Sequence, residues 1–362
     1  MDFEIKNYNS LDESLKVTWK SFEKESVNYC FQSYEWFENW VNNYRVNNNN
    51  FLLCICVVKY KSKVICIFPF EIEKKFNLKI LKWAGDKHTD YCSPLIRKDF
   101  FFDKKTFINL YEKVLSIIKN IDVVYLTKQP ECINEIKNPF IEFLKNFEDS
   151  QTYSISLPNK WEYYTNQILK REFYRQNLRK KKLLKRLGSL KFKIYENRDE
   201  KTSVLNELFK QKNIRLRSKK IEDILKSNDL EFYKEFEKEG VKDIKTHLSS
   251  LVLNNELIAI HWGVIYKKRF YYLLLSMQEG QLNKYSPGRL LISLLIRWSI
   301  SKKLEVFDFT LGGESYKKSW SNKNSYLFNY VESKSLKGFN FFLLIKIKLF
   351  LKKIYKKITT KK

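Results

Sequence analysis

Three apolar segments between residues 246 and 277 constrain the fold more than any other part of the chain. The segments 246–253, 257–266 and 269–277 are rich in Val, Ile, Leu, Phe and Tyr, and the turns between them are Asn254-Asn255 and Lys267-Lys268. Segments of this length and composition predict β-strands, and two-residue turns connect antiparallel neighbours. This part of the chain is therefore expected to form an antiparallel meander.

The first half of the chain has a related layout, although no repeated sequence is visible. The expected elements are helices over 33–46, 104–119 and 134–147, and strands over 51–60, 63–73, 78–83, 121–127 and 151–157. In the second half we expect helices over 161–187, 199–217, 221–239 and 287–303, and strands over 189–196, 304–310 and 325–333 besides the meander. Pro158-Asn159 punctuates the pattern, so the predicted domains are 1–158 and 159–333, with a tail over 334–362. This layout indicates an α/β (α+β) fold.

The chain is basic, with 68 Lys and Arg against 41 Asp and Glu, a net charge of +27. Two segments hold most of the excess: residues 160–195 and residues 334–362. The first is typical of a solvated helix face. Alternatives are that Arg175, Arg179 and Lys182 bind the phosphates of an acceptor, or that this helix binds tRNA. No other nucleic acid is expected as a partner.

The tail predicts a basic amphipathic helix over 338–362. At 100° per residue its lysines fall within one half of the helix, and most of its bulky apolar residues fall on the other, with Ile345 and Leu349 as exceptions. The lysines are Lys346, Lys348, Lys352, Lys353, Lys356 and Lys357; the apolar set is Leu343, Leu344, Ile347, Phe350, Leu351, Ile354 and Ile358. Such a helix can lie on an anionic membrane surface or dock on the protein's own body.

Other features bear on compartment and metal content. The N-terminus lacks an apolar signal-peptide core, and no apolar run is long enough to span a membrane. Cys54, Cys56 and Cys66 lie in predicted strands, as reduced cysteines that pack as small apolar residues do. We expect a cytoplasmic protein without metal, peripheral on the inner membrane face if the tail binds lipid.

The stretch Ser286-Pro287-Gly288 opens the helix predicted over 287–303. Ser286 suits the N-cap, Pro287 suits the first turn, and Gly288 leaves the helix start uncovered. Because a helix N-terminus presents free N–H groups, it can hold a phosphate, with Lys284 and Arg289 beside it. The simpler interpretation is an ordinary helix cap.

A second candidate cluster follows the strand over 304–310. Asp308 ends a buried strand, Gly312-Gly313 makes a flexible turn, and Tyr316 and Lys317 come next. Tyr316 is a candidate proton donor, and Lys317 can stabilise an oxyanion or a phosphate. The alternative is a glycine-rich turn followed by a solvated lysine.

The order of these blocks resembles the GNAT-related acyltransferases of the CelD-like type, distant relatives of the Fem-type aminoacyl transferases of cell-wall synthesis. The resemblance rests on Ser286-Pro287-Gly288, the block DFTLGGESYKKSW, the helix that ends at Gly188, and the early stretches SYEWFENWV and DKHTDYCSPL. It covers most of 30–333 and is strongest over 247–320.

The resemblance implies tandem GNAT-like domains with mixed, largely antiparallel central sheets flanked by helices. It further implies acyl transfer, most simply from acetyl-CoA, to an amino sugar or related precursor in cell-envelope or surface polysaccharide synthesis, with Lys284, Ser286, Gly288 and Arg289 at the donor. A lipid-linked or nucleotide-linked acceptor would meet Asp90, Tyr91, Arg175 and Arg179. The Q/R-x-x-G-x-G/A pyrophosphate loop of many GNAT proteins is missing from the sequence. Aminoacyl-tRNA therefore stays open as the donor, and a membrane or nucleic-acid binding relative without activity stays open as a third interpretation.

Three residues of the loop 85–92 allow another chemistry. His88, Asp90 and Cys92 have the residue types of a Cys–His nucleophilic site, and alternate spacing puts them on one face of an extended segment. We prefer a substrate-loop role, in which Asp90 or Asp308 is the base or orients the acceptor. His261, in an apolar strand, is expected to be a core histidine with satisfied nitrogens.

Overall fold

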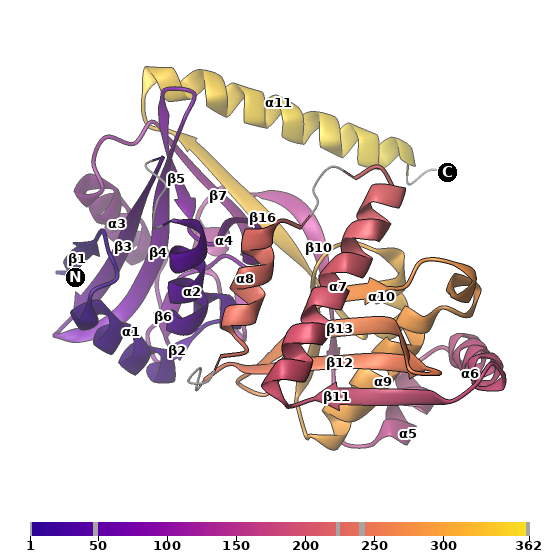
Figure 1. Cartoon of the computed structure of the whole chain (residues 1–362). Helices are drawn as coiled ribbons and strands as arrows, with labels where there is room; N and C mark the ends of the chain where they lie inside the picture. The colour runs from indigo at the N-terminus through magenta and orange to yellow at the C-terminus, as the bar shows by residue number, and fades with distance from the viewer. Residues whose placement is uncertain (1, 46–49, 222–224, 239–242, 360–362) are drawn as a thin grey trace. The chain divides into compact units, whose positions relative to one another are not determined.

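In the computed structural model the chain divides into two compact units (Figure 1). Unit 1 comprises residues 1–151 and 325–362, and unit 2 comprises residues 152–324. The structure describes residues 2–45, 50–221, 225–238 and 243–359, and within these it leaves out the side chains of residues 86 and 352–359.

Unit 1 is built on a sheet whose strand order is β1-β3-β4-β5-β7-β16. Along this order β5 and β7 run parallel, whereas the pairs β1–β3, β3–β4, β4–β5 and β7–β16 run antiparallel. Lys61 and Ser62, both with positive φ, form the tight turn of the expected β3–β4 hairpin. The strands are β1 (Glu4–Tyr8), β3 (Phe51–Tyr60), β4 (Lys63–Lys75), β5 (Leu78–Trp83), β7 (Val123–Pro130) and β16 (Lys323–Ser333).

Helices and short strands complete unit 1. They are α1 (Glu13–Glu25), β2 (Ser26–Val27), α2 (Tyr34–Tyr44), β6 (Leu95–Arg97), α3 (Lys104–Ile117), β8 (Cys132–Ile133), β9 (Ile136–Lys137), α4 (Pro139–Phe143) and α11 (Leu336–Thr359). Trp36 and Trp40 of α2 are buried, which confirms them as core residues. Phe140 of α4 contacts the rings of Phe68, Trp83 and Phe107. The helix expected over 134–147 is wrong, because its first part is the β8–β9 hairpin.

The last strand belongs to a different part of the molecule than we expected. β16 pairs with β7 of unit 1, from Leu327 opposite Pro130 to Ser333 opposite Val123, instead of completing the second domain. α11 follows directly and packs on the same unit through Phe341, Phe342 and Ile345. Backbone pairing therefore assigns β16 and α11 to unit 1, and it moves the first boundary from residue 158 to residues 151–152.

Unit 2 has a sheet in the order β10-β15-β14-β13-β12-β11. The expected meander is present as β12, β13 and β14, all antiparallel, whereas β14 and β15 are parallel. The strands are β10 (Phe147–Ser156, which begins in unit 1), β11 (Leu190–Tyr195), β12 (Lys245–Leu253), β13 (Glu256–Tyr266), β14 (Arg269–Met277) and β15 (Val306–Leu311).

The helices of unit 2 surround a large apolar core. They are α5 (Trp161–Tyr163), α6 (Arg171–Arg186), α7 (Arg198–Ser218), α8 (Ser227–Glu235), α9 (Pro287–Ser301) and α10 (Ser315–Trp320). The long helix expected over 161–187 is broken, because Leu169 is extended after a π-helical turn at Tyr164–Ile168. The hydroxyl of buried Tyr164 donates a hydrogen bond to the Trp320 carbonyl, which fixes this turn against α10. Of the helix expected over 221–239, residues 222–224 and 239 lie outside the described residues.

The mixed, largely antiparallel sheets flanked by helices confirm the expected fold class. The six cysteines are free thiols, and burial raises the pKa of Cys54 to about 11, so this thiol packs as an apolar group. Among the described residues, each helix is too short or too polar to cross a membrane.

Candidate functional site

The central feature of unit 2 is the place where two parallel strands part. β14 and β15 are paired from Arg269–Tyr271 against Val306–Asp308, and β14 then continues to Met277 without further backbone pairing to β15. Thr310 of β15 has a positive φ of 55°, a conformation that is strained for a β-branched residue. Strain of this kind is retained where the surrounding structure holds it, often at functional sites. The end of β15 is thus a distinctive local structure within the sheet.

Two tyrosines lie at this point. Tyr272 of β14 is buried, and its hydroxyl interacts with that of Tyr316. Burial raises the pKa of Tyr272 well above its usual value, and electrostatic interactions with Tyr316 and Glu314 raise it further. Burial and the charge of Glu314 also raise the pKa of Tyr316. Tyr316 therefore lies next to Tyr272, and both carry their protons at neutral pH.

Lys317 is drawn back into the loop between β15 and α10. Its ammonium donates to the Leu311 carbonyl at 2.7 Å and pairs with the Glu314 carboxylate at 3.0 Å. Gly312 has a φ of 126°, and a Cβ there would lie 2.8 Å from the Lys317 Nζ. The expected glycine-rich turn thus wraps around a buried lysine, so the alternative of a solvated lysine is wrong.

Asp308 is held by groups of its own unit. Its Oδ2 pairs with Arg269 at 2.8 Å, and its Oδ1 accepts the N–H of Thr310 at 2.8 Å. The carboxylate is buried at the three-residue contact between β14 and β15. These contacts fit a residue that fixes the point from which the two strands part.

The start of α9 differs in detail from an ordinary cap. Ser286 lies at the N-cap with a left-handed backbone, and its side chain makes no capping bond. Instead its hydroxyl accepts a hydrogen bond from the Lys180 ammonium at 2.6 Å. The N–H of Gly288 donates to the Met277 sulfur at 3.2 Å, so the expected uncovered helix start is wrong. A Cβ at Gly288 would lie 2.4 Å from that sulfur, which explains the glycine.

Cationic groups from two helices meet at the start of α9. Arg289 stacks on Phe173, with its guanidinium carbon 4.3 Å from the ring centroid. Its Nε and Nη2 atoms are buried and have no hydrogen-bond partner among the described residues. Burial lowers the pKa of Arg289, and burial with the charge of Arg289 lowers the pKa of Lys180. Two positive groups are held close together here, an arrangement that an anion would stabilise.

The inner face of α6 adds a further polar group. Asn177 is buried one helical turn before Lys180, and neither atom of its amide has a hydrogen-bond partner among the described residues. Buried polar groups without partners usually mark a water or ligand position. Together, Asn177, Lys180, Ser286 and Arg289 form what we term the α6–α9 polar cluster. Lys284, on the preceding 3₁₀ turn, is exposed.

The other predicted site residues lie elsewhere. Arg175 and Arg179 are exposed on α6, where they line a shallow hollow of its surface with Lys182. Asp90 and Tyr91 belong to unit 1, where the ring of Tyr91 packs between those of Tyr29 and Phe31.

The extended segment expected at His88, Asp90 and Cys92 is wrong, because Asp86–His88 form a 3₁₀ turn. His88 stacks on Tyr44 with ring centroids 4.6 Å apart, and Cys92 is buried. The pattern of alternate residues on one face therefore does not exist here.

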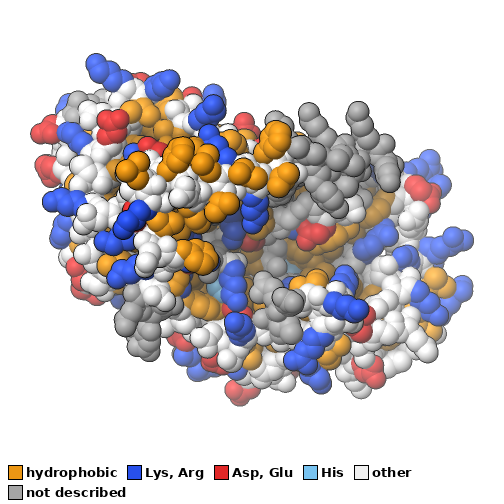
Figure 2. All heavy atoms as spheres, turned by 90° about the horizontal axis from the view of Figure 1, so that it is seen from above, with side chains coloured by type: hydrophobic (Ala, Val, Ile, Leu, Met, Phe, Trp, Pro, Cys, Tyr) orange, Lys and Arg blue, Asp and Glu red, His pale blue; other side chains and the backbone are white. Residues whose placement is uncertain are grey.

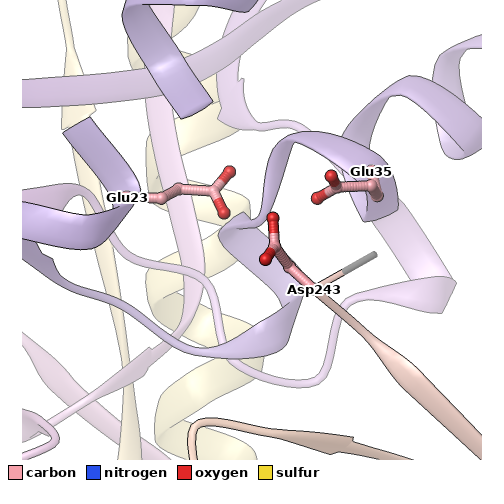
Figure 3. A group of neighbouring side chains, drawn as sticks. All are labelled: Glu23, Glu35 and Asp243. Atoms are coloured by element: carbon pink, nitrogen blue, oxygen red, sulfur yellow. The ribbon is translucent and has the colours of Figure 1, made fainter. Parts of the chain in front are cut away.

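Two buried carboxylates of unit 1 face each other in Figure 3, Glu23 from α1 and Glu35 from α2. Glu23 accepts the backbone N–H of Tyr34, and Glu35 pairs with Lys20 at 2.7 Å. The third side chain drawn, Asp243, belongs to unit 2. The Tyr34 amide and the Lys20 ammonium thus give each glutamate one partner within unit 1.

His261 is a core residue, as expected, but its nitrogens are not satisfied. It stacks on Tyr272 with ring centroids 4.6 Å apart, and His247 lies 6.2 Å away by the same measure. All four nitrogens of the two rings are buried without a hydrogen-bond partner among the described residues. Burial lowers the pKa of His247 to about 4 and that of His261 well below its usual value.

Sequence reasoning missed Lys180, Asn177, Tyr272 and Arg269. Lys180 stands in a run of basic residues and Tyr272 in an apolar strand, so neither carries a local signal. Their roles depend on partners that are 106 positions away for Lys180 and 39 for Arg269.

Comparison with known proteins covers both the domain and the whole chain. Residues 172–318 match the family model for an acetyltransferase (GNAT) domain. A structure of FemX has a TM-score of 0.57 at 12% identity and covers 92% of this chain and 98% of its own. L-PGS from Bacillus licheniformis has a TM-score of 0.55 at 9% identity, covering 93% of this chain and 96% of its own. A tandem GNAT protein from the clavulanic acid biosynthesis pathway has a TM-score of 0.50 at 9% identity, covering 92% of this chain and 99% of its own. No curated protein matches the sequence. At these identities the structures share the fold.

Proposed function

We propose that the protein transfers an acyl group from acyl-CoA to the amine of an amino sugar or a related cell-envelope precursor, because residues 172–318 match the family model for an acetyltransferase (GNAT) domain. The observation that carries this proposal is the point beside Tyr316 where β14 and β15 separate. Tyr316 packs on the same apolar core as the start of α9. Acyl transfer needs a donor thioester held in place, an acid for the leaving thiolate, and charge stabilisation at the carbonyl oxygen.

The α6–α9 polar cluster supports binding of the donor's phosphates. Buried N–H groups of Arg289 and the ammonium of Lys180 are donors that suit a pyrophosphate, and the exposed Lys284 adds charge at the entrance. The N–H of Gly288 already donates a hydrogen bond to the Met277 sulfur, so it is not free for a phosphate. Side chains, more than the free end of the helix, therefore hold the phosphates in this proposal.

Tyr316 acts as the acid. The amine nitrogen attacks the thioester carbonyl, the C–N bond forms, and the C–S bond breaks. The departing thiolate takes the proton of Tyr316, and the proton lost by the amine restores the phenol. The raised pKa of Tyr316 means that the phenol is protonated at neutral pH and has a proton to donate.

Lys317 stabilises the oxyanion and holds the loop that carries Tyr316. An ammonium has three N–H donors, and Leu311 and Glu314 engage two of them. The third is directed to the carbonyl oxygen in this proposal. Unchanged turnover in a well-folded Lys317→Ala variant would contradict the assignment.

The acceptor is the less defined partner. Arg175 and Arg179 are exposed on α6 and offer charge to a phosphate of a nucleotide-linked or lipid-linked acceptor. Asp90 and Tyr91 of unit 1 stay in the proposal as acceptor-binding residues, whereas the contacts of Asp308 favour a structural role.

One observation favours a second candidate, aminoacyl-tRNA as the donor. α6 holds eight Lys and Arg residues and one Glu, and its basic outer face adjoins the α6–α9 polar cluster. A continuous positive surface of this kind suits a polyphosphate chain longer than that of CoA.

The decisive experiment measures release of CoA thiol from acetyl-CoA and from longer acyl-CoAs with amino sugars and their nucleotide-linked forms as acceptors. Acceptor-dependent release that falls in the Tyr316→Phe variant supports the first proposal. No release from any acyl-CoA, together with transfer from charged tRNA to a peptidoglycan precursor, supports the second. Inactivity in both assays contradicts both.

A further inference from the structure

The first turn of α11 is locked onto unit 1. Asp122, between α3 and β7, accepts the Ser335 hydroxyl at 2.6 Å and the Lys79 N–H at 2.9 Å. Burial raises the pKa of Asp122, but these hydrogen bonds outweigh it and hold the pKa below its usual value. A Cβ at Gly338 would lie 2.0 Å from the Asp122 carbonyl oxygen, so the helix backbone touches the unit directly. The start of α11 is therefore fixed in orientation.

The face that packs inward is not the face with most apolar residues. Phe341, Phe342 and Ile345 pack on the cluster formed by Leu78, Ile80, Val123 and Val331. Ile345 and Leu349, which break the amphipathic pattern of the sequence, are both partly buried. The apolar residues outside the apolar stripe are thus the ones turned away from solvent.

The apolar stripe itself faces solvent. Its residues are Leu336, Phe339, Leu343, Leu344, Ile347, Phe350 and Leu351, with exposed fractions from 41% to 94%. They gather on the surface seen in Figure 2, over the described part of α11. Helical geometry places them on one side, opposite Phe341, Phe342 and Ile345. An exposed stripe of seven large apolar side chains marks an interaction surface.

Lysines border this stripe on both sides. At 100° per residue, Lys337 and Lys348 fall along one edge and Lys346 along the other. The Lys346 ammonium lies 4.5 Å from the centroid of the Phe342 ring. Residues 334–362 contain ten Lys and no Asp or Glu. The side chains of Lys352, Lys353, Lys356, Lys357, Ile354 and Ile358 lie outside the part of the chain that the structure describes.

We propose that the outer face of α11 binds an anionic lipid bilayer, with its apolar stripe in the interfacial region and its lysines at the headgroups. Bulky apolar side chains flanked by lysines are the pattern of an interfacial helix, because the long lysine side chains reach the phosphates while the apolar groups enter the acyl boundary. A second copy of the chain would bring these lysines against each other without a carboxylate to offset them. Charge complementarity therefore favours the anionic bilayer.

The experiment is flotation of the full chain with vesicles of phosphatidylcholine alone or mixed with phosphatidylglycerol. Binding is expected only with phosphatidylglycerol, and it should weaken as salt rises. Leu344→Asp with Ile347→Asp should lower the partition coefficient about a hundredfold, because two apolar groups leave the interface. Lys348→Gln should lower it about fivefold. The matched control is Phe76→Asp, an apolar side chain of unit 1 with 77% exposure, which should leave binding unchanged.

Three results would overturn the proposal. The first is that the wild-type chain fails to float with phosphatidylglycerol vesicles, and the second is that the double aspartate variant binds as well as the wild type. The third is a wild-type dimer that dissociates in the double variant, with no vesicle binding, since the stripe would then be a contact between copies. Unchanged thermal unfolding of the variants checks that they fold, as expected for exposed positions.

Discussion

Tyr316 keeps its proton at neutral pH because burial and the Glu314 carboxylate both disfavour its charged form. If it is the acid for the leaving thiolate, Tyr316→Phe should lower kcat about a hundredfold and leave KM nearly unchanged. Steady-state measurement of thiol release tests this. Tyr163→Phe, at an exposed tyrosine of the same unit, is the control and should match the wild type. Equal kcat values for all three proteins would remove Tyr316 from the mechanism.

The two buried histidines of unit 2 make stability depend on pH. Burial lowers the pKa of His247 in the folded chain to about 4, whereas the unfolded side chain titrates near 6.5. The unfolded state therefore binds more protons between these values, and the free energy of unfolding falls as pH drops through this window. From pH 7 to pH 5 the loss from His247 should be about 2 kcal/mol.

Urea denaturation at the two pH values measures this loss. His247→Phe removes the titrating group, so the difference between pH 7 and pH 5 should shrink, although His261 still contributes to it. An equally steep dependence in the variant would show that His247 takes up its proton as readily in the folded chain as in the unfolded chain.

For the individual site residues, the sequence indicated which side chains matter better than it indicated their contacts. Ser286 was expected to cap α9, but its hydroxyl is taken by Lys180, which stands 106 positions earlier. Asp308 was expected to face an acceptor, but Arg269 and the Thr310 amide hold it. Local pattern cannot reveal such partners, because only folding brings them within hydrogen-bond distance.

The packing of α11 on unit 1 depends on one close contact of its backbone, at Gly338. Gly338→Ala should destabilise unit 1 by about 2 kcal/mol, because the new Cβ would lie 2.0 Å from the Asp122 carbonyl oxygen, an atom that cannot move aside cheaply. In an unhindered helix the same change would stabilise the chain by about 1 kcal/mol, so even the sign is informative. Thermal unfolding gives the result.

Gly313→Ala provides the matched control, since a Cβ there meets nothing within 4 Å. It should leave stability within about 1 kcal/mol of the wild type. If Gly338→Ala were as harmless, α11 would be able to shift away from β7 without cost, and its start would not be fixed in orientation.

Several elements follow from periodicity alone, while others depend on contacts. The hairpin β3–β4, the meander β12–β14 and helix α9 have bounds close to those expected, because alternating or 3.6-residue apolar patterns and two-residue turns specify them locally. The break between α5 and α6 has no such signal. It arises where Tyr164 is buried against Trp320, a contact 156 positions apart.

Unit 1 is made of two segments of the chain, and unit 2 lies between them in the sequence. Removal of residues 325–362 should leave unit 2 folded and prevent unit 1 from folding, because β7 would lose β16 and the core would lose Phe341, Phe342 and Ile345. Hydrogen exchange of the chain 1–324 should show lost protection in β7 and retained protection in β12–β14.

A chain that ends at residue 359 is the control and should be protected throughout, as the full chain is. Retained protection of β7 in the chain 1–324 would contradict the assignment of β16 as an essential strand of unit 1. Loss of protection in both units would show that they fold only together.

The return of β16 to unit 1 also orders events during synthesis. Every strand and helix of unit 2 leaves the ribosome before β16 does, although most of unit 1 is made first. Unit 2 can therefore finish folding before β16 is available to pair with β7. Until then the edge of β7 is exposed, and an exposed strand edge can pair incorrectly. Chaperones that cover strand edges should accordingly act on the nascent first half of this chain until its last residues emerge.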